Sequence, residues 1–199
     1  QYTSSAASDV YKRQGDGGIN PATRELIERL FGPEGAYPHL ADAFKPRSSL
    51  GYRVRSIDVP ASGSKRWARY QTEHVKMTAI PVHHGDIPAL AWRIEIAGQS
   101  IVITGSFNNS KNLVATFAKD ADVLVVSHAI PENSRGVLRD LYARPSQLGR
   151  VADQADARMM ILGHRSVRTR GRESLSRNAI EENYDGTILF ANDGECWGL

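Results

Sequence analysis

Histidine and serine residues directly follow four of the expected β-strands, at the point where each strand ends. Neutral imidazole is a good zinc ligand, and a site built at several strand ends is rigid enough to hold a metal ion. A single histidine after a strand is more often structural or solvated, but histidines at three strand ends make a shared site an equal alternative. Because α/β sheets place their sites at the carboxyl ends of strands, we expect these residues to meet there. The four runs are His83-His84-Gly85, Gly105-Ser106-Phe107, Ser127-His128-Ala129 and Gly163-His164-Arg165.

The composition restricts the chemistry further. A single cysteine, Cys196, excludes an internal disulfide framework and a cysteine-based zinc finger, so a metal site would use the six histidines and carboxylates. With 199 residues, of which 41% are hydrophobic and 24% charged, the chain matches one globular domain. A net charge of +3 and a pI near 9.1 permit an anionic partner but do not by themselves indicate nucleic-acid binding. No apolar run approaches the roughly 20 residues of a membrane span.

The periodicity predicts hairpins first and alternating helices and strands afterwards. After Asn20-Pro21 a short amphipathic helix is expected, which ends near Gly32, and a second short helix over 40–44. The all-apolar strands that alternate with helices in the second half indicate an α/β fold whose sheet is covered by helices. Strands are expected over 52–59, 65–71, 74–82, 90–96, 99–104, 123–126, 158–162 and 187–191, and the later helices over 111–119, 145–156 and 173–184.

The first 14 residues do not fit this pattern. They have no apolar period, and residues 4–14 resemble a peptide translated from sequencing-adapter DNA. We therefore interpret residues 1–14 as a non-native tail and expect the natural protein to continue upstream of Gly15. Residues 15–199 are then expected to form one partial domain.

The second half of the sequence resembles the metallo-β-lactamase-fold hydrolases, among them ribonuclease Z enzymes, phosphodiesterases and arylsulfatase-like members. The resemblance covers about residues 40–199 and implies the C-terminal half of a four-layer αββα sandwich, with the N-terminal half missing. It rests on an ordered string of motifs rather than on any one of them. These motifs lie at residues 78–95, 98–105, 121–132, 160–165, 168–173 and 189–194.

The resemblance implies a site with two metal ions, usually zinc. His84 corresponds to the histidine before the hairpin strand, because Gly85 sets that register in preference to His83, and His164 corresponds to the last metal histidine. Ser106 stands where the family usually has an aspartate that bridges the metals, and a serine hydroxyl is a weak, neutral ligand. The family's His-x-His-x-Asp-His cluster does not occur in this sequence and is expected upstream, so this stretch would hold one zinc ion or none.

Further roles follow from the same resemblance. His128 falls where some members keep a catalytic histidine, with a partly buried structural histidine as an equal alternative. Arg165 and Arg168 suit an anionic substrate group, because guanidinium forks match phosphate and sulfate oxygens; a solvated loop is the alternative.

The expected function is metal-assisted hydrolysis of a phosphodiester, sulfate or other ester in a small molecule or a nucleic acid. The alternative is a non-catalytic relative that binds an anionic partner such as RNA, which Ser106 favours. For the chain as given we expect weak or no catalysis, and aggregation or a homodimer through an uncovered sheet face. The sequence predicts no membrane partner and indicates no localisation.

Overall fold

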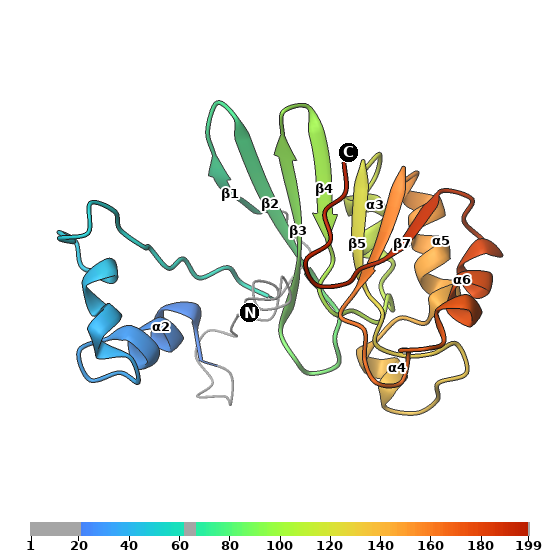
Figure 1. Cartoon of the computed structure of the whole chain (residues 1–199), viewed down its shortest axis with the longest axis horizontal. Helices are drawn as coiled ribbons and strands as arrows, with labels where there is room; N and C mark the ends of the chain where they lie inside the picture. Colours follow the sequence, from blue (N-terminus) through green and yellow to red (C-terminus); the bar gives the residue numbers. More distant parts are fainter. Residues whose placement is uncertain (1–20, 62–66, 199) are drawn as a thin grey trace. The chain divides into compact units, whose positions relative to one another are not determined.

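The computed structural model describes residues 21–61 and 67–198, in two compact units with a boundary near residue 62. The expected non-native tail, residues 1–14, lies outside the described residues. Each unit is described separately below (Figure 1).

The smaller unit is built on two short helices. Helix α2 (Thr23–Phe31) and the 3-10 helix η1 (Pro38–Phe44) lie close to the expected positions, and the rings of Phe31 and Phe44 stack with centroids 5.1 Å apart. The Asp58 carboxylate accepts a hydrogen bond of 3.2 Å from the backbone N–H of Arg24, which ties the later part of this unit to the start of α2.

The expected strand over residues 52–59 is wrong. Those residues are extended but belong to no strand, and Tyr52, Val54 and Ile57 are exposed. Alternating apolar and charged residues favour an extended backbone, but a β-strand also needs a neighbouring strand to satisfy its N–H and C=O groups. Here the N–H of Val54 donates instead to the carbonyl of Ala43 in η1.

The larger unit contains one mixed sheet of seven strands, arranged in the order of the sequence. The first four strands pair antiparallel and the last four parallel (Figure 1). Each lies within two residues of its expected position. The strands are β1 (Trp67–Gln71), β2 (Val75–Val82), β3 (Ala89–Ile96), β4 (Gln99–Ile103), β5 (Val123–Ser127), β6 (Met159–Gly163) and β7 (Thr187–Phe190).

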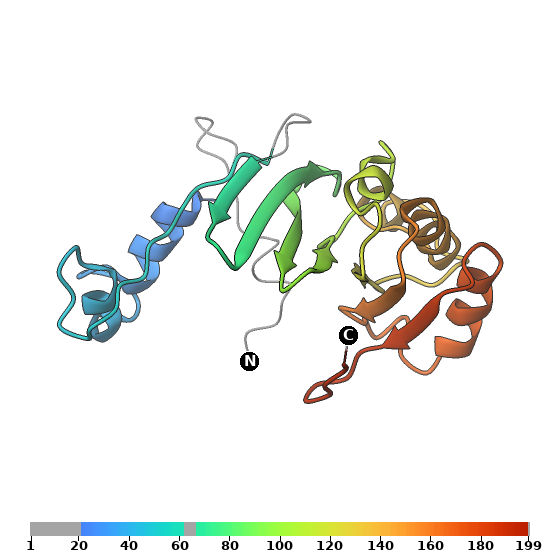
Figure 2. The same ribbon diagram turned by 90° about the horizontal axis from the view of Figure 1, so that it is seen from above.

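Helices cover one face of the parallel part of this sheet (Figure 2). They are α3 (Leu113–Phe117), α5 (Pro145–Ala155) and α6 (Glu173–Glu181), while the one-turn helix α4 (Leu138–Leu141) precedes α5. Alternate residues of each strand point to this face and pack with the apolar sides of the helices. The buried core includes Val102, Leu124, Val126, Met160, Leu162 and Ile188 from the strands, and Val114, Phe117, Leu148, Val151, Ala155 and Ile180 from the helices.

The other face of the sheet also carries apolar side chains. Ile101, Ile103, Val125 and Leu189 are only half-buried there, whereas their neighbours on the helix-covered face are buried. One sheet with one helix layer is half of an αββα sandwich, as the sequence predicts. Among the described helices, none has the length and apolar character needed to cross a membrane.

The strand directions define two edges of the sheet. β2 is antiparallel to β3, and β3 is antiparallel to β4, so β2 runs in the same direction as β4, β5, β6 and β7. We call the edge where these five strands end the carboxyl edge, and the edge where they begin the amino edge.

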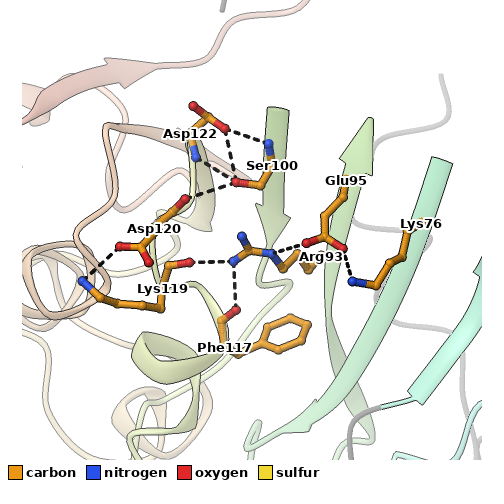
Figure 3. A network of polar contacts seen from close by, with 8 residues as sticks. All are labelled: Lys76, Arg93, Glu95, Ser100, Phe117, Lys119, Asp120 and Asp122. Atoms are coloured by element: carbon orange, nitrogen blue, oxygen red, sulfur yellow. Dashed lines mark hydrogen bonds and ion pairs between the residues drawn. The ribbon is translucent and has the colours of Figure 1, made fainter. Parts of the chain in front are cut away.

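Charged side chains form a network at the amino edge (Figure 3). The guanidinium of Arg93 donates to the carbonyl oxygens of Phe117, at 3.3 Å, and Lys119, at 2.8 Å. The Glu95 carboxylate lies 3.6 Å from Arg93 and 2.5 Å from the Lys76 ammonium. Since Phe117 and Lys119 are at the C-terminal end of α3, this network fixes that helix end to β3.

A second cluster at the amino edge joins β4 to the segment before β5. One oxygen of the Asp122 carboxylate accepts hydrogen bonds from the N–H of Ser100, at 2.8 Å, and from its hydroxyl, at 3.2 Å. The other oxygen lies 3.5 Å from the Arg158 guanidinium. Every charge in this cluster therefore has a partner (Figure 3 shows Ser100 and Asp122).

Candidate functional site at the carboxyl edge

The topology brings all four expected polar runs to the carboxyl edge. His84 follows β2, Ser106 follows β4, His128 follows β5 and His164 follows β6. β5 and β6 are paired as far as Ser127 and Gly163, and the N–H of His128 donates to the carbonyl of Gly163 over 2.8 Å.

His84 is buried, and its ring orientation is fixed by a backbone group. Its Nδ1 lies 2.6 Å from the carbonyl oxygen of Leu141, and because a carbonyl only accepts, Nδ1 carries the hydrogen. In the neutral ring the lone pair is then on Nε2, the nitrogen available to a metal ion. The competing residue, His83, is exposed, and its backbone carbonyl accepts a hydrogen bond from the N–H of Asn108.

His164 occupies a turn directly after β6. Its φ of +49° is in the left-handed region, which a non-glycine residue adopts rarely and at some cost, and its side chain is exposed. Its imidazole ring contacts the ring of Tyr142, with centroids 6.5 Å apart, and the His84 ring contacts that same tyrosine edge-on at 5.1 Å. The two histidines, from β2 and β6, therefore share one aromatic neighbour.

Sequence reasoning missed Tyr142. It follows α4 in a segment with neither a strand nor a histidine motif, and its neighbours His84 and His164 are distant in the sequence. Only the fold brings these three rings together, so no local pattern indicated it.

Ser106 is buried in the loop after β4, and this loop is anchored on both sides. The N–H of Asn108 donates to the carbonyl of His83 over 2.8 Å, and the carbonyl of Phe107 accepts from the N–H of Ala143 over 2.6 Å. The loop thereby connects the end of β2 to the segment that carries Tyr142.

His128 is only 1% exposed and faces the helix-covered side of the sheet. Its Nε2 lies 2.8 Å from the Ser176 hydroxyl of α6, and its ring packs on Phe190 of β7 with centroids 5.4 Å apart. Burial lowers the pKa of His128 to about 4, so the ring is neutral at pH 7. This placement favours the alternative of a structural histidine, because the ring is buried and its Nε2 and its face are both in contact with side chains of the fold.

The arginine-rich loop after His164 is ordered by hydrogen bonds rather than freely solvated. The Thr169 hydroxyl donates to the carbonyl of His128 over 2.8 Å, and the Ser166 hydroxyl donates to the carbonyl of Ala129 over 2.6 Å. Both contacts fix the loop to the segment that follows β5.

The two arginines predicted to bind substrate differ. Arg165 is largely buried, lies 3.5 Å from the Glu173 carboxylate and donates to the Asn192 side-chain oxygen over 3.1 Å. Backbone N–H groups, from Glu173 itself and from Gly171, together with the Arg165 charge, lower the pKa of Glu173. Arg168 is exposed, and among the described residues no carboxylate pairs with it. Of these two arginines, only Arg168 has a guanidinium without a carboxylate partner in the described part of the chain.

Solved structures with the same arrangement of elements identify the fold. A metallo-β-lactamase fold protein, YhfI from Bacillus subtilis, matches 64% of this chain at a TM-score of 0.57 and 20% identity. The chain has part of the metallo-β-lactamase fold. Unliganded yeast PDE1 matches 85% of the chain at a TM-score of 0.57 and 14% identity, and the short form of human tRNase Z matches 64% at 0.48 and 16%.

The matched region spans only about half of these longer proteins. It covers 51% of YhfI, 56% of PDE1 and 44% of the human tRNase Z. No protein-family model and no curated protein sequence matches this chain. The likeness to solved structures therefore shows the fold, here a part of the metallo-β-lactamase sandwich.

The metallo-β-lactamase fold raises the question of a metal site, and the described residues hold only part of one. His84 and His164 are zinc ligands by type, but a catalytic zinc site uses three protein ligands and a structural one four. In residues 21–61 and 67–198, no three or more His, Cys, Asp or Glu side chains lie close enough together to hold a metal ion. These residues do not by themselves fit a zinc centre.

Proposed function

We propose that this chain is the C-terminal part of a metal-dependent hydrolase with the metallo-β-lactamase fold, and that its carboxyl edge supplies His84 and His164 as metal ligands. The observation that carries the proposal is the hydrogen bond from His84 Nδ1 to the carbonyl of Leu141, which leaves Nε2 as the nitrogen available to a metal ion. Backbone carbonyls of this kind fix the tautomer of metal-binding histidines. The shared contact with Tyr142 supports His164 as the second ligand.

The remaining ligands are proposed to come from residues outside the described part of this chain. Two imidazoles bind a zinc ion weakly, and the matched region is about half as long as YhfI. Ser106, at the position proposed for the bridging aspartate, adds a neutral hydroxyl and little metal affinity. This stretch alone is then expected to hold one zinc ion or none and to show weak or no catalysis.

The proposed substrate is an ester of phosphate or sulfate, in a small molecule or a nucleic acid. Arg168 supports this class because its guanidinium is exposed, has no carboxylate partner among the described residues and lies four residues after His164. Arg165 is proposed to hold the same loop in place through Glu173 and Asn192. His128 is the residue proposed as catalytic. In this structure its backbone carbonyl accepts the hydrogen bond from the Thr169 hydroxyl and so helps to hold the arginine-rich loop in place.

A non-catalytic relative that binds an anionic partner such as RNA is the second candidate. The observation that favours it is Ser106, since a neutral hydroxyl in place of a carboxylate weakens a metal centre. Arg168 would serve this function equally well. The two candidates differ in whether His84 and His164 bind metal.

A cobalt titration of the whole chain tests the ligand assignment. Cobalt(II) reports imidazole binding by its absorption spectrum, and we expect weak binding that His84→Ala and His164→Ala each reduce by about tenfold or more. His74→Ala is the matched control, because His74 is an exposed histidine near the amino edge of the same sheet. Equal affinity in all four proteins would remove both histidines from the proposed site.

The DNA upstream of the codon for Gly15 tests the remaining part of the proposal. An in-frame segment that encodes His-x-His-x-Asp-His would supply the expected ligands. An in-frame stop codon directly upstream would instead favour the non-catalytic candidate.

A further inference from the structure

One short segment connects three strand ends at the carboxyl edge. We call residues 140–143 the bridging segment. The carbonyl of Asp140 accepts a hydrogen bond of 2.5 Å from the Asn108 side chain, and the N–H of Ala143 donates to the carbonyl of Phe107 over 2.6 Å. Both partners lie in the loop after β4 that carries Ser106, so the bridging segment is fixed at its two ends.

The bridging segment also contacts the turn that carries His84. Leu141 accepts the hydrogen bond from His84 Nδ1, and its side chain packs against Gly85. Gly85 has φ +58°, and a Cβ there would lie 2.9 Å from Leu141 Cδ2. Glycine therefore permits both the turn and the close approach of Leu141.

Tyr142, the next residue, extends these contacts to His164. Its ring meets the His84 ring edge-on at an interplanar angle of 63° and the His164 ring nearly parallel at 28°. No hydrogen bond joins the imidazole of His164 to any other described side chain, and its ring contact is with Tyr142. Tyr142 is thus the described residue whose ring is placed to orient the His164 imidazole.

We infer that Tyr142 is a positioning residue that holds the His84 and His164 imidazoles in one fixed arrangement, while the Leu141 carbonyl sets the tautomer of His84. The naming of the two histidines as metal ligands rests on the proposed function, but the positioning itself does not. Aromatic contacts of this kind restrict ring rotation, and a carbonyl partner restricts which nitrogen carries the hydrogen.

The ring, rather than the hydroxyl, carries this role. Among the described residues, the Tyr142 hydroxyl has no hydrogen-bond partner. Tyr142→Phe should therefore preserve the arrangement, and Tyr142→Leu should remove it. Tyr70→Leu is the matched control, because Tyr70 is an exposed tyrosine of the same sheet, opposite Met77 in β2.

Nuclear magnetic resonance of the metal-free full chain tests the inference. In the unaltered protein we expect nuclear Overhauser contacts from the Tyr142 ring to both imidazoles, and nitrogen shifts that show hydrogen on Nδ1 of His84. Tyr142→Leu should change the shifts of the His84 and His164 ring protons, while Tyr142→Phe and Tyr70→Leu leave them in place. Missing contacts in the unaltered protein would overturn the inference, even if Tyr142→Leu fails to fold.

A cobalt titration of the same variants separates this inference from the proposed function. If both hold, Tyr142→Leu weakens cobalt binding by about 10- to 100-fold, the usual effect of losing a partner of a metal ligand, and Tyr142→Phe does not. Tighter binding in Tyr142→Leu would mean that the ring obstructs the metal position, and would overturn the positioning role. If Tyr142→Leu changes the imidazole shifts but His84→Ala and His164→Ala leave the cobalt affinity unchanged, the positioning role stands and the ligand assignment fails.

Discussion

The two edges of the sheet use their polar side chains in opposite ways. At the amino edge, Arg93, Glu95 and Asp122 each have a charged or backbone partner within 4 Å (Figure 3). Among the described residues, four buried side-chain atoms lack a hydrogen bond, and three of these atoms lie at the carboxyl edge. One is in the loop after β4, one is at the end of β5, and one is in the residue that follows β5. These three are Asn109 Oδ1, Ser127 Oγ and His128 Nδ1.

The two edges therefore differ in how completely their polar atoms are paired. A buried polar atom without a partner costs free energy, so each of these three atoms makes the carboxyl edge less stable than a fully hydrogen-bonded edge would be. At the same edge, within the described residues, His84 Nε2 makes no hydrogen bond and the exposed guanidinium of Arg168 has no carboxylate partner. At the amino edge, by contrast, the charges of Arg93, Glu95 and Asp122 are already paired.

Acid should damage the carboxyl edge first, and His128 carries the largest expected effect. Its pKa is about 4 in the folded protein and near 6.5 in the unfolded chain, so below pH 6.5 the unfolded chain binds more protons. Stability should therefore fall between pH 6.5 and 4, by about 3 kcal/mol in total, and level off for this group below pH 4. Urea unfolding at a series of pH values measures it.

The matched variant for this prediction is His128→Gln. Its amide keeps a partner for the Ser176 hydroxyl but does not titrate, so the slope between pH 6.5 and 4 should become shallow. Glu173 and Arg165 are the charged groups that act on His128, and the pKa of Glu173 is already lowered, so its own contribution is lost only below about pH 4.5. An equally steep slope in His128→Gln would assign the acid sensitivity to other groups.

Asp122→Ala should cause the largest loss at the amino edge. It removes the acceptor of the buried Ser100 N–H and hydroxyl and the partner of Arg158, and an unpaired buried N–H costs about 1–3 kcal/mol. Asp122→Asn keeps an acceptor oxygen, so it should lose less. Urea unfolding at pH 7 compares them, and the ring-proton shifts of His84 should stay the same in both. A changed His84 shift would mean that the two edges are not independent.

The sequence was sufficient to predict the strands and the edge at which His84 and His164 lie. Both follow from alternation and from the rule that parallel strands end together. It was not sufficient for residues 52–59, where the same alternation gave an extended segment without a neighbouring strand. Contacts between distant residues were equally inaccessible: neither the pairing of Arg165 with Asn192 nor the shared neighbour Tyr142 leaves a local signal. The second face of the sheet is only half-buried, so dimerisation or aggregation stays a prediction. Light scattering would test it.

The smallest expected effect comes from removing the exposed ion pair between Lys76 and Glu95, which lies beside the more buried contacts of Arg93. Lys76 and Arg93 share the Glu95 carboxylate, but the Lys76 side chain is 47% exposed and that of Arg93 only 19%. Exposed ion pairs contribute under about 1 kcal/mol, so Lys76→Met should change stability little at pH 7. Lys111→Met, at an exposed lysine that the described residues leave unpaired, is the control.

The pH dependence of the Lys76 variant gives a sharper measurement than its stability at neutral pH. The hydrogen bond from Lys76 is the main cause that lowers the pKa of Glu95. A lowered carboxyl pKa adds stability above its ordinary value of about 4.5, and that stability is lost as the pH falls through the folded pKa. Lys76→Met should therefore raise the pKa of Glu95, measured by carboxyl carbon shifts, while Arg93 remains bound to Phe117 and Lys119. A loss of stability as large as that of Asp122→Ala would show instead that the whole amino edge acts as one cooperative network, with its exposed pair no weaker than its buried contacts.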